Sequence, residues 1–433
     1  MQDGRRPRLI VMFEEGAVTP SEILLSLTEW ADLIIVLGDS PYTLTAAPFL
    51  EGIAETTPLQ QPRDQLIALL RQWEPDGIIT YAERMLVPTA EIADALNLLF
   101  HSPETAMLLR DKYAQRRRLA AAGVQETKSA HLRDTTQWSN VVRDVGLPVV
   151  VKPRLGEGSQ YTHLVRDEAS GAMLLSRLAA EYGGELVAEE FIEGQSRLPF
   201  GDYVSVESYV VEGEITHLAI TGKFPILPPF REQGHFWPAP VSSAEHDEII
   251  ALTRRALLAL DIRTGITHTE VKLTSEGPRL IEVNGRIGGQ INELALRACG
   301  VDLIAAAAAI AMGHPVHGLA LNPQGTFFQY HNLPPLAACR LTEVSGVQDA
   351  KQVDGVQSYE VYLHPPAELN RGVMTTWIDV IRGRATNHLE MLDILDRANA
   401  KLSFTYDTVE GPLTAPAMWT LQRTGSALVG PPI

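Results

Sequence analysis

The stretch RLIEVNGRIGG, residues 279–289, decides how this sequence is interpreted. Residues i and i+2 of a β-strand point to the same face, so Glu282 and Asn284 share a face if the apolar run before them is a strand. A carboxylate and an amide oxygen are hard-oxygen ligands suited to Mg2+. Arg286 follows, and its guanidinium group could hold an anion such as a phosphate or a carboxylate. Taken alone, the stretch fits equally well a strand that runs into a polar turn.

A second predicted strand, THTEVKLT at 267–274, lies just before this stretch and is joined to it by the turn SEGP. An antiparallel pair with this spacing brings Glu270 onto the face that carries Glu282 and Asn284. Three oxygen ligands on one face form a metal cluster of the kind that bridges Mg2+ to phosphates.

Two lysines occupy positions that suit a nucleotide. Lys152 ends the apolar strand VVVKPR, and Lys112 lies on the helix before it. A buried lysine is costly because its charge loses water, so both lysines are predicted to hold phosphates. The following LGEGS loop, residues 155–159, is expected to cover those phosphates with the backbone N–H groups of Gly156, Gly158 and Ser159.

The segment AEEFIEG, residues 188–194, has the apolar and acidic character of a hinge beside an adenine. The hinge residues are Glu189, Glu190, Phe191 and Ile192. Backbone groups of Glu189 and Ile192 would pair with the edge of the base. An acidic side chain further on, Asp202 or Glu207, would accept hydrogen bonds from the ribose hydroxyls.

Composition sets further bounds. A chain of 433 residues is long enough for two to four structural units, and its net charge of −17 argues against nucleic acid as the main partner. The two cysteines, Cys299 and Cys339, are expected to be buried thiols, as in a reducing cytoplasm. The longest apolar run, at 301–313, is too short for a bilayer and predicts a buried helix. We therefore expect a cytoplasmic protein without membrane or nucleic-acid partners.

The alternation of helical and strand patterns predicts three parts. Residues 1–101 form a three-layer α/β domain, and residues 102–315 carry the nucleotide-binding elements. Residues 316–433 form a β-rich domain. A single helix is predicted from Pro103 to about Gly123, with Ser102 as its N-cap.

Six of these elements occur in an order that resembles the ATP-grasp superfamily. They are Lys112, VVKP at 150–153, the glycine loop, EEFIEG, HTEVK and EVNGRIGG. The occurrence of all six elements in this order is specific to the superfamily, although each element alone is weak evidence. The flanking parts are similar to those of the carboxylate–amine ligases in this superfamily, and the whole chain most resembles the L-amino acid ligases that make dipeptides.

The resemblance implies an ATP-grasp fold of the α/β (α+β) class, with a small lobe at about 123–186 that covers the nucleotide, and an ATP-dependent ligase. In such enzymes ATP phosphorylates a carboxylate, an amine attacks the acyl phosphate, and ADP and phosphate are released. Lys112 and Lys152 would then hold phosphates. Glu270, Glu282 and Asn284 would bind two Mg2+ ions, with Mn2+ as an alternative, and Arg286 would grip the acyl phosphate or the substrate carboxylate.

The loop FREQGHF before the metal strands supplies Glu232 and His235, which match an acidic residue and a histidine that contact amino-acid substrates in dipeptide-forming relatives. Either residue is a possible general base. The helix after Arg286 begins GGQINEL, and Gln290 there replaces a bulky residue that narrows the acyl-donor pocket in relatives selective for small amino acids. A roomier or more polar donor site is expected. The resemblance leaves homodimerisation open.

Two alternatives stay open at this point. One is another ATP-grasp chemistry, such as a carboxylase or a formate-dependent transferase, and the other is a non-catalytic nucleotide sensor.

Several charged residues are expected to have no role at the site. The RRR run at 116–118 is predicted to be a solvated helix face, and Glu14, Glu15 and Glu83 are predicted to lie on surface loops.

Overall fold

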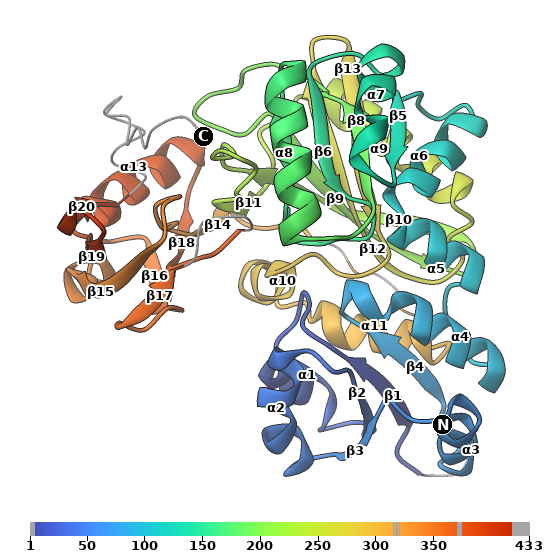
Figure 1. Cartoon of the computed structure of the whole chain (residues 1–433). Coiled ribbons are helices and arrows are strands. Elements are labelled where there is room, and N and C mark those ends of the chain that lie inside the picture. The colour runs from blue at the N-terminus through green and yellow to red at the C-terminus, as the bar shows by residue number, and fades with distance from the viewer. Residues whose placement is uncertain (1–4, 315, 317–318, 320, 370–374, 418–433) are drawn as a thin grey trace. The chain divides into compact units, whose positions relative to one another are not determined.

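The computed structural model describes residues 5–314, 316, 319, 321–369 and 375–417. The chain forms two compact units (Figure 1). The first unit combines Met1–Thr127, Ser205–Ile220 and Ser242–Asn322, and the second combines Lys128–Val204, Thr221–Val241 and Pro323–Ile433. The three ranges predicted from the sequence are a division along the chain, and they stay a prediction.

The first unit begins with a parallel sheet in the order β3-β2-β1-β4, coloured blue in Figure 1. Its strands are β1 (Arg8–Phe13), β2 (Asp32–Leu37), β3 (Glu55–Pro58) and β4 (Gly77–Thr80). The helices between and after them are α1 (Pro20–Leu27), α2 (Pro41–Glu51), α3 (Arg63–Gln72) and α4 (Leu86–Leu96). The α/β alternation predicted for this region is confirmed, although α2 and β3 were not predicted.

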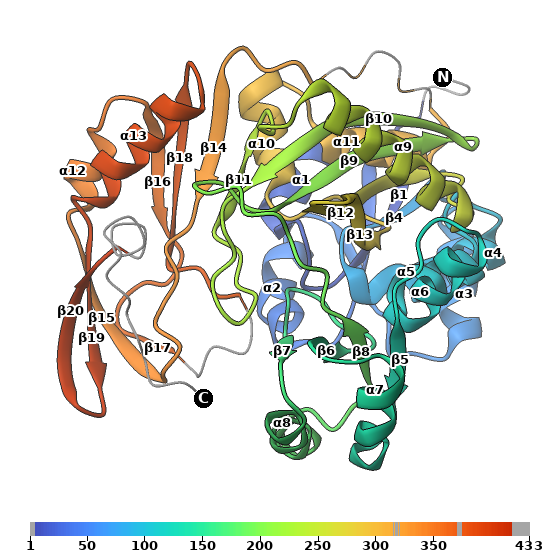
Figure 2. The same cartoon turned by 90° about the horizontal axis from the view of Figure 1, so that it is seen from above.

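The remainder of the first unit is built around strands in the order β13-β12-β9-β10, of which β12 and β13 are antiparallel, while the first two residues of β9 and the last three of β10 belong to the second unit. They are β9 (Tyr203–Val211), β10 (Glu214–Lys223), β12 (Gly265–Thr274) and β13 (Gly277–Asn284). Helix α9 (Ser243–Ala259) packs against β13 (Figure 2). After β13 come α10 (Ile291–Cys299) and α11 (Leu303–Ala311), and α11 is the buried helix predicted from the apolar run.

The single helix predicted from Pro103 to Gly123 is wrong. The structure has α5 (Pro103–Arg110) and α6 (Lys112–Ala121), separated at Asp111. Asp111 has extended backbone angles, and its carboxylate accepts hydrogen bonds from the backbone N–H groups of Tyr113 and Ala114, at 3.1 and 3.0 Å. This is N-cap geometry, which starts a new helix and puts Lys112 at its first position.

The second unit contains a small lobe with an antiparallel sheet in the order β5-β8-β6-β7. Its strands are β5 (Ser129–Leu132), β6 (Val149–Pro153), β7 (His163–Val165) and β8 (Leu186–Glu190), and its helices are α7 (Trp138–Asp144) and α8 (Glu168–Glu181). The predicted hairpin of β6 and β7 across the glycine loop is confirmed. Val149, Val151 and Leu178 are among the buried residues that join the helices to the sheet.

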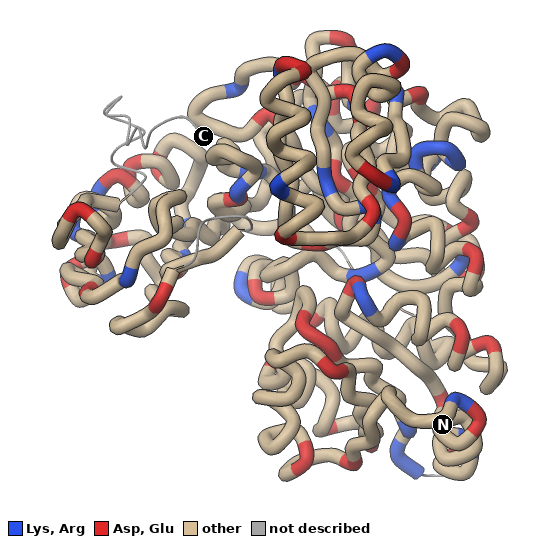
Figure 3. The backbone as a smooth tube through the Cα atoms, viewed as in Figure 1, with Lys and Arg blue, Asp and Glu red and all other residues tan. Residues whose placement is uncertain are grey.

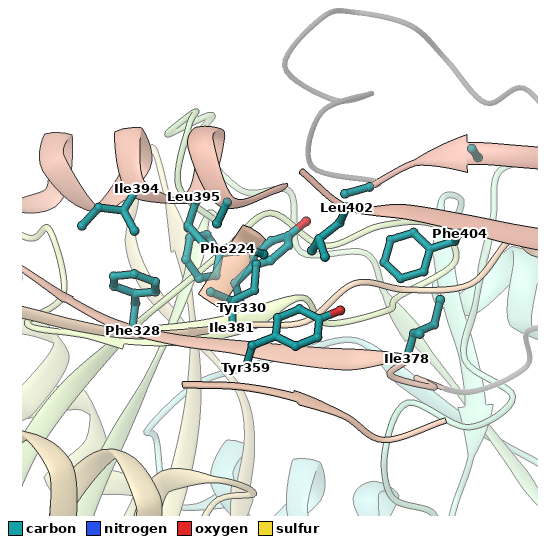
Figure 4. Packing of buried hydrophobic residues seen from close by; sticks show 14 of the residues in the cluster. Phe224, Phe328, Tyr330, Tyr359, Ile378, Ile381, Ile394, Leu395, Leu402 and Phe404 are labelled. Carbon is teal, nitrogen blue, oxygen red and sulfur yellow. The ribbon is translucent and has the colours of Figure 1, made fainter. Parts of the chain in front are cut away.

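The rest of the second unit is rich in strands. Strands β11 (Gly234–Trp237), β14 (Thr326–Tyr330), β18 (Asp379–Ala385) and β16 (Val356–Val361) are neighbours in that order. A smaller sheet in the order β17-β15-β19-β20 contains β17 (Ala367–Leu369), β15 (Cys339–Ser345), β19 (Ser403–Thr408) and β20 (Gly411–Pro416). Helices α12 (Val347–Lys351) and α13 (His388–Asn399) also belong to this unit. Ile394 and Leu395 of α13 belong to a buried cluster with Phe224, Phe328 and Tyr330 (Figure 4).

Charged residues of both signs are interspersed along the two units (Figure 3). Both cysteines are free thiols, with Cys339 buried and Cys299 half-buried. In the part of the chain that the structure describes, no single helix has the length and apolar character needed to cross a membrane. Helices α10 and α11 meet these criteria only as a bent pair, by length and composition alone.

Candidate active site

The facing strands β12 and β13 carry the oxygen ligands predicted from the sequence. Glu270 is directly opposite Glu282, and His268 is directly opposite Asn284. Because residues two apart on a strand share a face, these four side chains gather on one face of the pair. The pairing register shifts between Glu270 and Val271, so the bulge follows the acidic pair.

A lysine completes this face. Lys112 donates a hydrogen bond from Nζ to Oε1 of Glu282, at 2.7 Å. The break at Asp111 makes this contact possible, because it starts α6 at Lys112. The structure therefore brings together Lys112, Glu270, Glu282 and Asn284 within the first unit.

His268 is a member of this group that sequence reasoning missed. Its Nδ1 lies 2.9 Å from Oε2 of Glu207, and its Nε2 lies 3.7 Å from Oε1 of Glu270. Glu207 is buried and also accepts a hydrogen bond from the hydroxyl of Ser205, at 2.9 Å. The structure thus places Glu207 behind the acidic pair, while its predicted contact with a ribose stays a prediction. His268 lies two residues before Glu270 on the same strand, and this spacing is a sequence signal that both side chains share a face.

Arg286 lies in the loop after β13, where its Nε is 3.0 Å from Oε2 of Glu83. Glu83 comes from the short 3-10 helix Glu83–Met85 that follows β4. It is buried, and burial raises the pKa of its carboxyl group while the positive charge of Arg286 opposes that rise. The prediction that Glu83 and Glu14 lie on surface loops is wrong, since both are buried. Glu14 instead accepts hydrogen bonds at the start of α2, from Thr43 at 2.6 Å and from Ser40.

The RRR run differs from its prediction as well. Arg116 is buried and donates a hydrogen bond to the backbone oxygen of Leu280, at 3.0 Å. The neighbouring Arg118 is exposed and donates to the backbone oxygen of Ala259. Arg116 therefore ties α6, and with it Lys112, to the strand that carries Glu282.

Two glycines of the quoted stretch are required by close packing. A Cβ atom at Gly288 would overlap the ring of His268, and one at Gly285 would lie 2.5 Å from Cδ1 of Leu109. A Cβ atom at Gly289 would meet nothing within 4 Å. The loop that carries Arg286 can thus lie against His268 only because residue 288 has no side chain.

The nucleotide-binding residues predicted in the second unit centre on another buried pair. Lys152 Nζ lies 2.9 Å from Oε2 of Glu189, and both side chains are buried. Glu189 lies opposite Val150 of β6 and Ser129 of β5, so it occupies the middle strand of its sheet. Breaking such a pair leaves an uncompensated buried charge.

The hinge continues from Glu189 at the end of β8. The backbone N–H of Glu190 donates to Lys128, at 2.9 Å, and that of Phe191 donates to Pro148, at 3.1 Å. Ile192 lies beyond the strand. Asp202 is half-buried just before β9. Pairing of an adenine with this hinge and of a ribose with Asp202 stay predictions.

The glycine loop joins β6 to β7. Gly158 and Ser159 have positive φ angles of 60° and 56°. The backbone oxygen of Gly158 accepts a hydrogen bond from Thr375 N, at 3.4 Å, and Gly156 lies close to Pro153. The role of this loop as a phosphate cover is a prediction.

Glu232 and His235 also lie in the second unit. His235 is buried in β11, directly opposite Lys223 of β10, and Glu232 comes just before this strand. Lys223 Nζ is 3.8 Å from Oε2 of Glu232. Sequence reasoning did not single out Lys223.

The side chains predicted as metal ligands on β12 and β13 have the oxygen chemistry that Mg2+ prefers. Among the described residues, no group of three or more His, Cys, Asp or Glu side chains has metal-site geometry. The predicted set does not depend on such a group, because it combines two carboxylates with the amide oxygen of Asn284. The Nδ2 of Asn284 donates to the backbone oxygen of His268, at 3.4 Å, and the amide oxygen Oδ1 is the predicted ligand atom. All three donors are hard oxygen atoms.

Comparison with known proteins agrees with this geometry. Residues 145–293 match the ATP-grasp domain family. The y4rH protein of Sinorhizobium fredii is 26% identical over 346 residues, which cover 78% of this chain and 70% of that protein. Alanine–anticapsin ligase of Bacillus subtilis is 25% identical over 249 residues, which cover 54% of this chain and 52% of that enzyme. The match thus spans about half the length of that curated enzyme.

A solved structure shows the same fold over nearly the whole chain. The crystal structure of an L-amino acid ligase from Bacillus licheniformis has a TM-score of 0.77 and 20% identity, and the match covers 93% of this chain and 100% of that chain. The family match, the curated relatives and this fold agree with the order of the motifs. Residues 145–293 therefore resemble the ATP-grasp domain family, and the chain as a whole has the fold of the L-amino acid ligase structure.

Proposed function

We propose that this protein is an ATP-dependent carboxylate–amine ligase that joins the carboxylate of one amino acid to the amine of another. The reaction passes through an acyl phosphate and releases ADP and phosphate. The observation that carries the proposal is the face on which Glu270, Glu282 and Asn284 gather, with Lys112 bonded to Glu282. A cation beside oxygen ligands is the arrangement expected where phosphates and Mg2+ meet.

The proposed roles of the binding residues follow from their charges. Glu270, Glu282 and Asn284 hold Mg2+, which when bound neutralises the charge on the phosphates of ATP. Lys112 and Lys152 hold phosphate oxygens, with Gly156, Gly158 and Ser159 as backbone donors. The hinge from Glu189 to Ile192 holds the adenine, and Asp202 or Glu207 receives the ribose hydroxyls.

The chemistry requires stabilisation of charge more than a covalent catalyst. An oxygen of the substrate carboxylate attacks the γ-phosphorus of ATP, and the bond to ADP breaks. The amine then attacks the acyl carbon, and phosphate leaves with the bonding electrons while the amine loses a proton. Arg286 stabilises the acyl phosphate, because a guanidinium group matches the geometry of phosphate and carboxylate oxygens. Glu232 and His235 contact the amino-acid substrates, and either can serve as the general base that removes the proton from the amine.

The relatives support amino acids as the substrates. Two of them, an alanine–anticapsin ligase and an L-amino acid ligase, are by name ligases that act on amino acids. Gln290 is the N-cap of α10 and stands where a bulky residue would narrow the donor pocket, so a donor larger than alanine is expected. Activity confined to glycine or alanine as the donor would contradict this part of the proposal.

The proposal is tested by phosphate release from ATP and Mg2+ across a matrix of amino-acid pairs, with mass spectrometry of the products. Release that needs two amino acids and yields their dehydrated conjugate supports the ligase and identifies both substrates. Release with one carboxylate together with bicarbonate or formate would instead indicate a carboxylase or a transferase. Tight ATP binding without release in any mixture would indicate a nucleotide sensor.

A further inference from the structure

The second unit buries a lysine next to the loop that carries Glu232. Lys223 is the last residue of β10, and only 3% of its surface is exposed. It is directly opposite His235 in the pairing of β10 with β11, so the two side chains lie on the same face. A buried ammonium group is unfavourable unless a compensating charge lies close to it. The neighbouring carboxylate of Glu232 supplies that charge.

Glu232 is held by two groups and remains reachable from solvent. Lys223 Nζ lies 3.8 Å from its Oε2, and Tyr203 Oη donates to its Oε1, at 3.2 Å. The lysine also lies over the ring of Tyr203, with Nζ 5.8 Å from the ring centre. Whereas Arg231 and Gln233 on either side are buried, 27% of the Glu232 side chain is exposed. The carboxylate is thus the accessible end of an otherwise buried charged group.

The backbone of Glu232 is fixed on both sides. Its N–H donates to the hydroxyl of Thr375, at 3.3 Å, and its backbone oxygen accepts a hydrogen bond from Trp377 Nε1, at 3.0 Å. The Trp377 ring is stacked on the ring of His331, with the ring centres 4.0 Å apart and an angle of 9° between the planes. Arg231 donates to the backbone oxygen of Pro334, at 2.6 Å. Such support gives a binding group a defined direction before its ligand arrives.

A carboxylate in this setting selects a cation. It has about four lone-pair positions. Tyr203 occupies one of them, and the 3.8 Å separation from Lys223 Nζ is longer than a hydrogen bond. Because 27% of the Glu232 side chain is exposed, a ligand can reach the carboxylate, where a charge-assisted hydrogen bond from an ammonium group would be favourable.

We propose that Lys223 and Tyr203 are positioning residues that hold Glu232 so that its carboxylate binds the amino group of an amino-acid substrate. The inference rests on the proposed function and deepens it, because it assigns recognition of one substrate group to three named side chains. Lys223 balances the charge of Glu232 within the protein, and Tyr203 sets its direction. Neither residue touches the substrate in this arrangement.

The test measures kcat, the KM of each amino acid and the KM of ATP for a set of variants. Lys223→Met removes the charge and keeps much of the side-chain volume, whereas Lys223→Arg keeps the charge. Tyr203→Phe removes only the hydroxyl group. Lys351→Met, at the exposed end of α12, is the control for the loss of one lysine charge.

Lys223→Met is expected to raise the KM of one amino acid about tenfold or more, with the KM of ATP unchanged. Lys223→Arg is expected to recover most of that loss, and Tyr203→Phe to raise the same KM by roughly threefold to tenfold. Lys351→Met is expected to behave as the wild type. A general loss of stability would lower the amount of active enzyme without raising the KM of one substrate alone.

An unchanged amino-acid KM in both Tyr203→Phe and Lys223→Met would overturn the inference. If Lys223→Met does not fold, Tyr203→Phe decides the matter alone. The wild type, assayed in parallel, distinguishes a failure of the proposed function from a failure of the roles given to Lys223 and Tyr203. Without amino-acid-dependent ADP formation by the wild type, the proposed function fails, whereas an active wild type with unaffected variants removes only the role of Lys223 and Tyr203.

Discussion

Arg286 Nε lies 3.0 Å from Oε2 of Glu83, so the arginine proposed to grip the acyl phosphate already has a carboxylate partner in the first unit. The carboxylate is buried, and its desolvation raises the pKa of Glu83 while Arg286 opposes that effect. Each group therefore compensates the charge of the other. A substrate that binds Arg286 has to share this guanidinium group with Glu83 or replace it.

Removing Arg286 should separate ligation from nucleotide binding. Arg286→Ala is expected to lower kcat/KM for ligation by about a hundredfold or more, because a charge that stabilises the acyl phosphate is lost. Equilibrium binding of ATP should remain within a few-fold of the wild type. Arg263→Ala is the control, since Arg263 is exposed and pairs with Asp261. A large drop in ATP affinity would give Arg286 a different role.

Glu282 should be essential for turnover. Glu282→Ala removes a metal ligand and the partner of Lys112, so ATP turnover is expected to fall at least a hundredfold while circular dichroism shows a retained fold. Glu276→Gln, in the exposed turn between β12 and β13, is the matched control and should keep full activity. Near-normal turnover by Glu282→Ala would show that the metal face is wrongly assigned.

The Lys152–Glu189 pair allows stability to be separated from nucleotide binding. Lys152→Met leaves the Glu189 carboxylate buried without its cation, so we expect a loss of about 3–5 kcal/mol in the free energy of unfolding, together with weak ATP binding. The double variant Lys152→Met/Glu189→Gln removes both charges and should recover much of the stability. Its ATP affinity should stay low. Recovery of ATP binding in the double variant would mean that Lys152 has only a structural role.

Gly288 and Gly289, in the loop after β13, provide a test variant and its control at neighbouring positions. Gly288→Ala would push a methyl group into the ring of His268, which lies between Glu207 and Glu270, so turnover is expected to fall about tenfold or more. Gly289→Ala has open space and should be close to the wild type. Equal turnover of the two variants would argue that the position of His268 does not matter for activity.

Asp379 in the second unit should make stability depend on pH. Burial raises the pKa of its carboxyl group to about 6, and hydrogen bonds from Tyr359 Oη and Asn332 N, at 2.6 and 3.0 Å, oppose the rise. Because the pKa of Asp379 in the folded state lies above the ordinary value of 3.8, its protonated carboxyl group stabilises the folded state. This contribution to the free energy of unfolding is complete below about pH 4 and is lost as pH rises through 6.

Asp379→Asn is the comparison, because an amide does not titrate. The free energy of unfolding of the wild type, measured relative to this variant by urea titration, should fall by up to about 3 kcal/mol between pH 4 and pH 7.5. A difference that stays constant across this range would contradict the assignment of the titration to Asp379.

Local spacing explains which parts could be predicted from the sequence. The acidic pair on β12 and β13 follows from a short turn and from strand periodicity, and the structure confirms that Glu270 faces Glu282. Ser102 caps α5 as predicted, through a hydrogen bond from Thr105 N, at 3.1 Å. These features depend on residues a few positions apart, for which backbone geometry leaves few choices.

Other features depended on packing or on weak signals. Helix α2 contains Pro48, and β3 has only four residues, so neither has a clear pattern. The start of α6 depends on an N-cap aspartate, Asp111, within a longer stretch of helix-forming residues, so the helical pattern alone does not locate it. By contrast, the contact of Glu83 with Arg286 joins elements far apart in the chain, and strand periodicity does not predict it.

The central claim is ligation through an acyl phosphate, and isotope transfer tests it most directly. The donor amino acid is labelled with 18O in its carboxylate and incubated with the enzyme, ATP, Mg2+ and the acceptor, and the phosphate is analysed by mass spectrometry. The proposed reaction transfers one carboxylate oxygen to each phosphate, so phosphate with a single 18O should accumulate in step with the conjugate. Conjugate formed together with unlabelled phosphate would contradict the acyl phosphate.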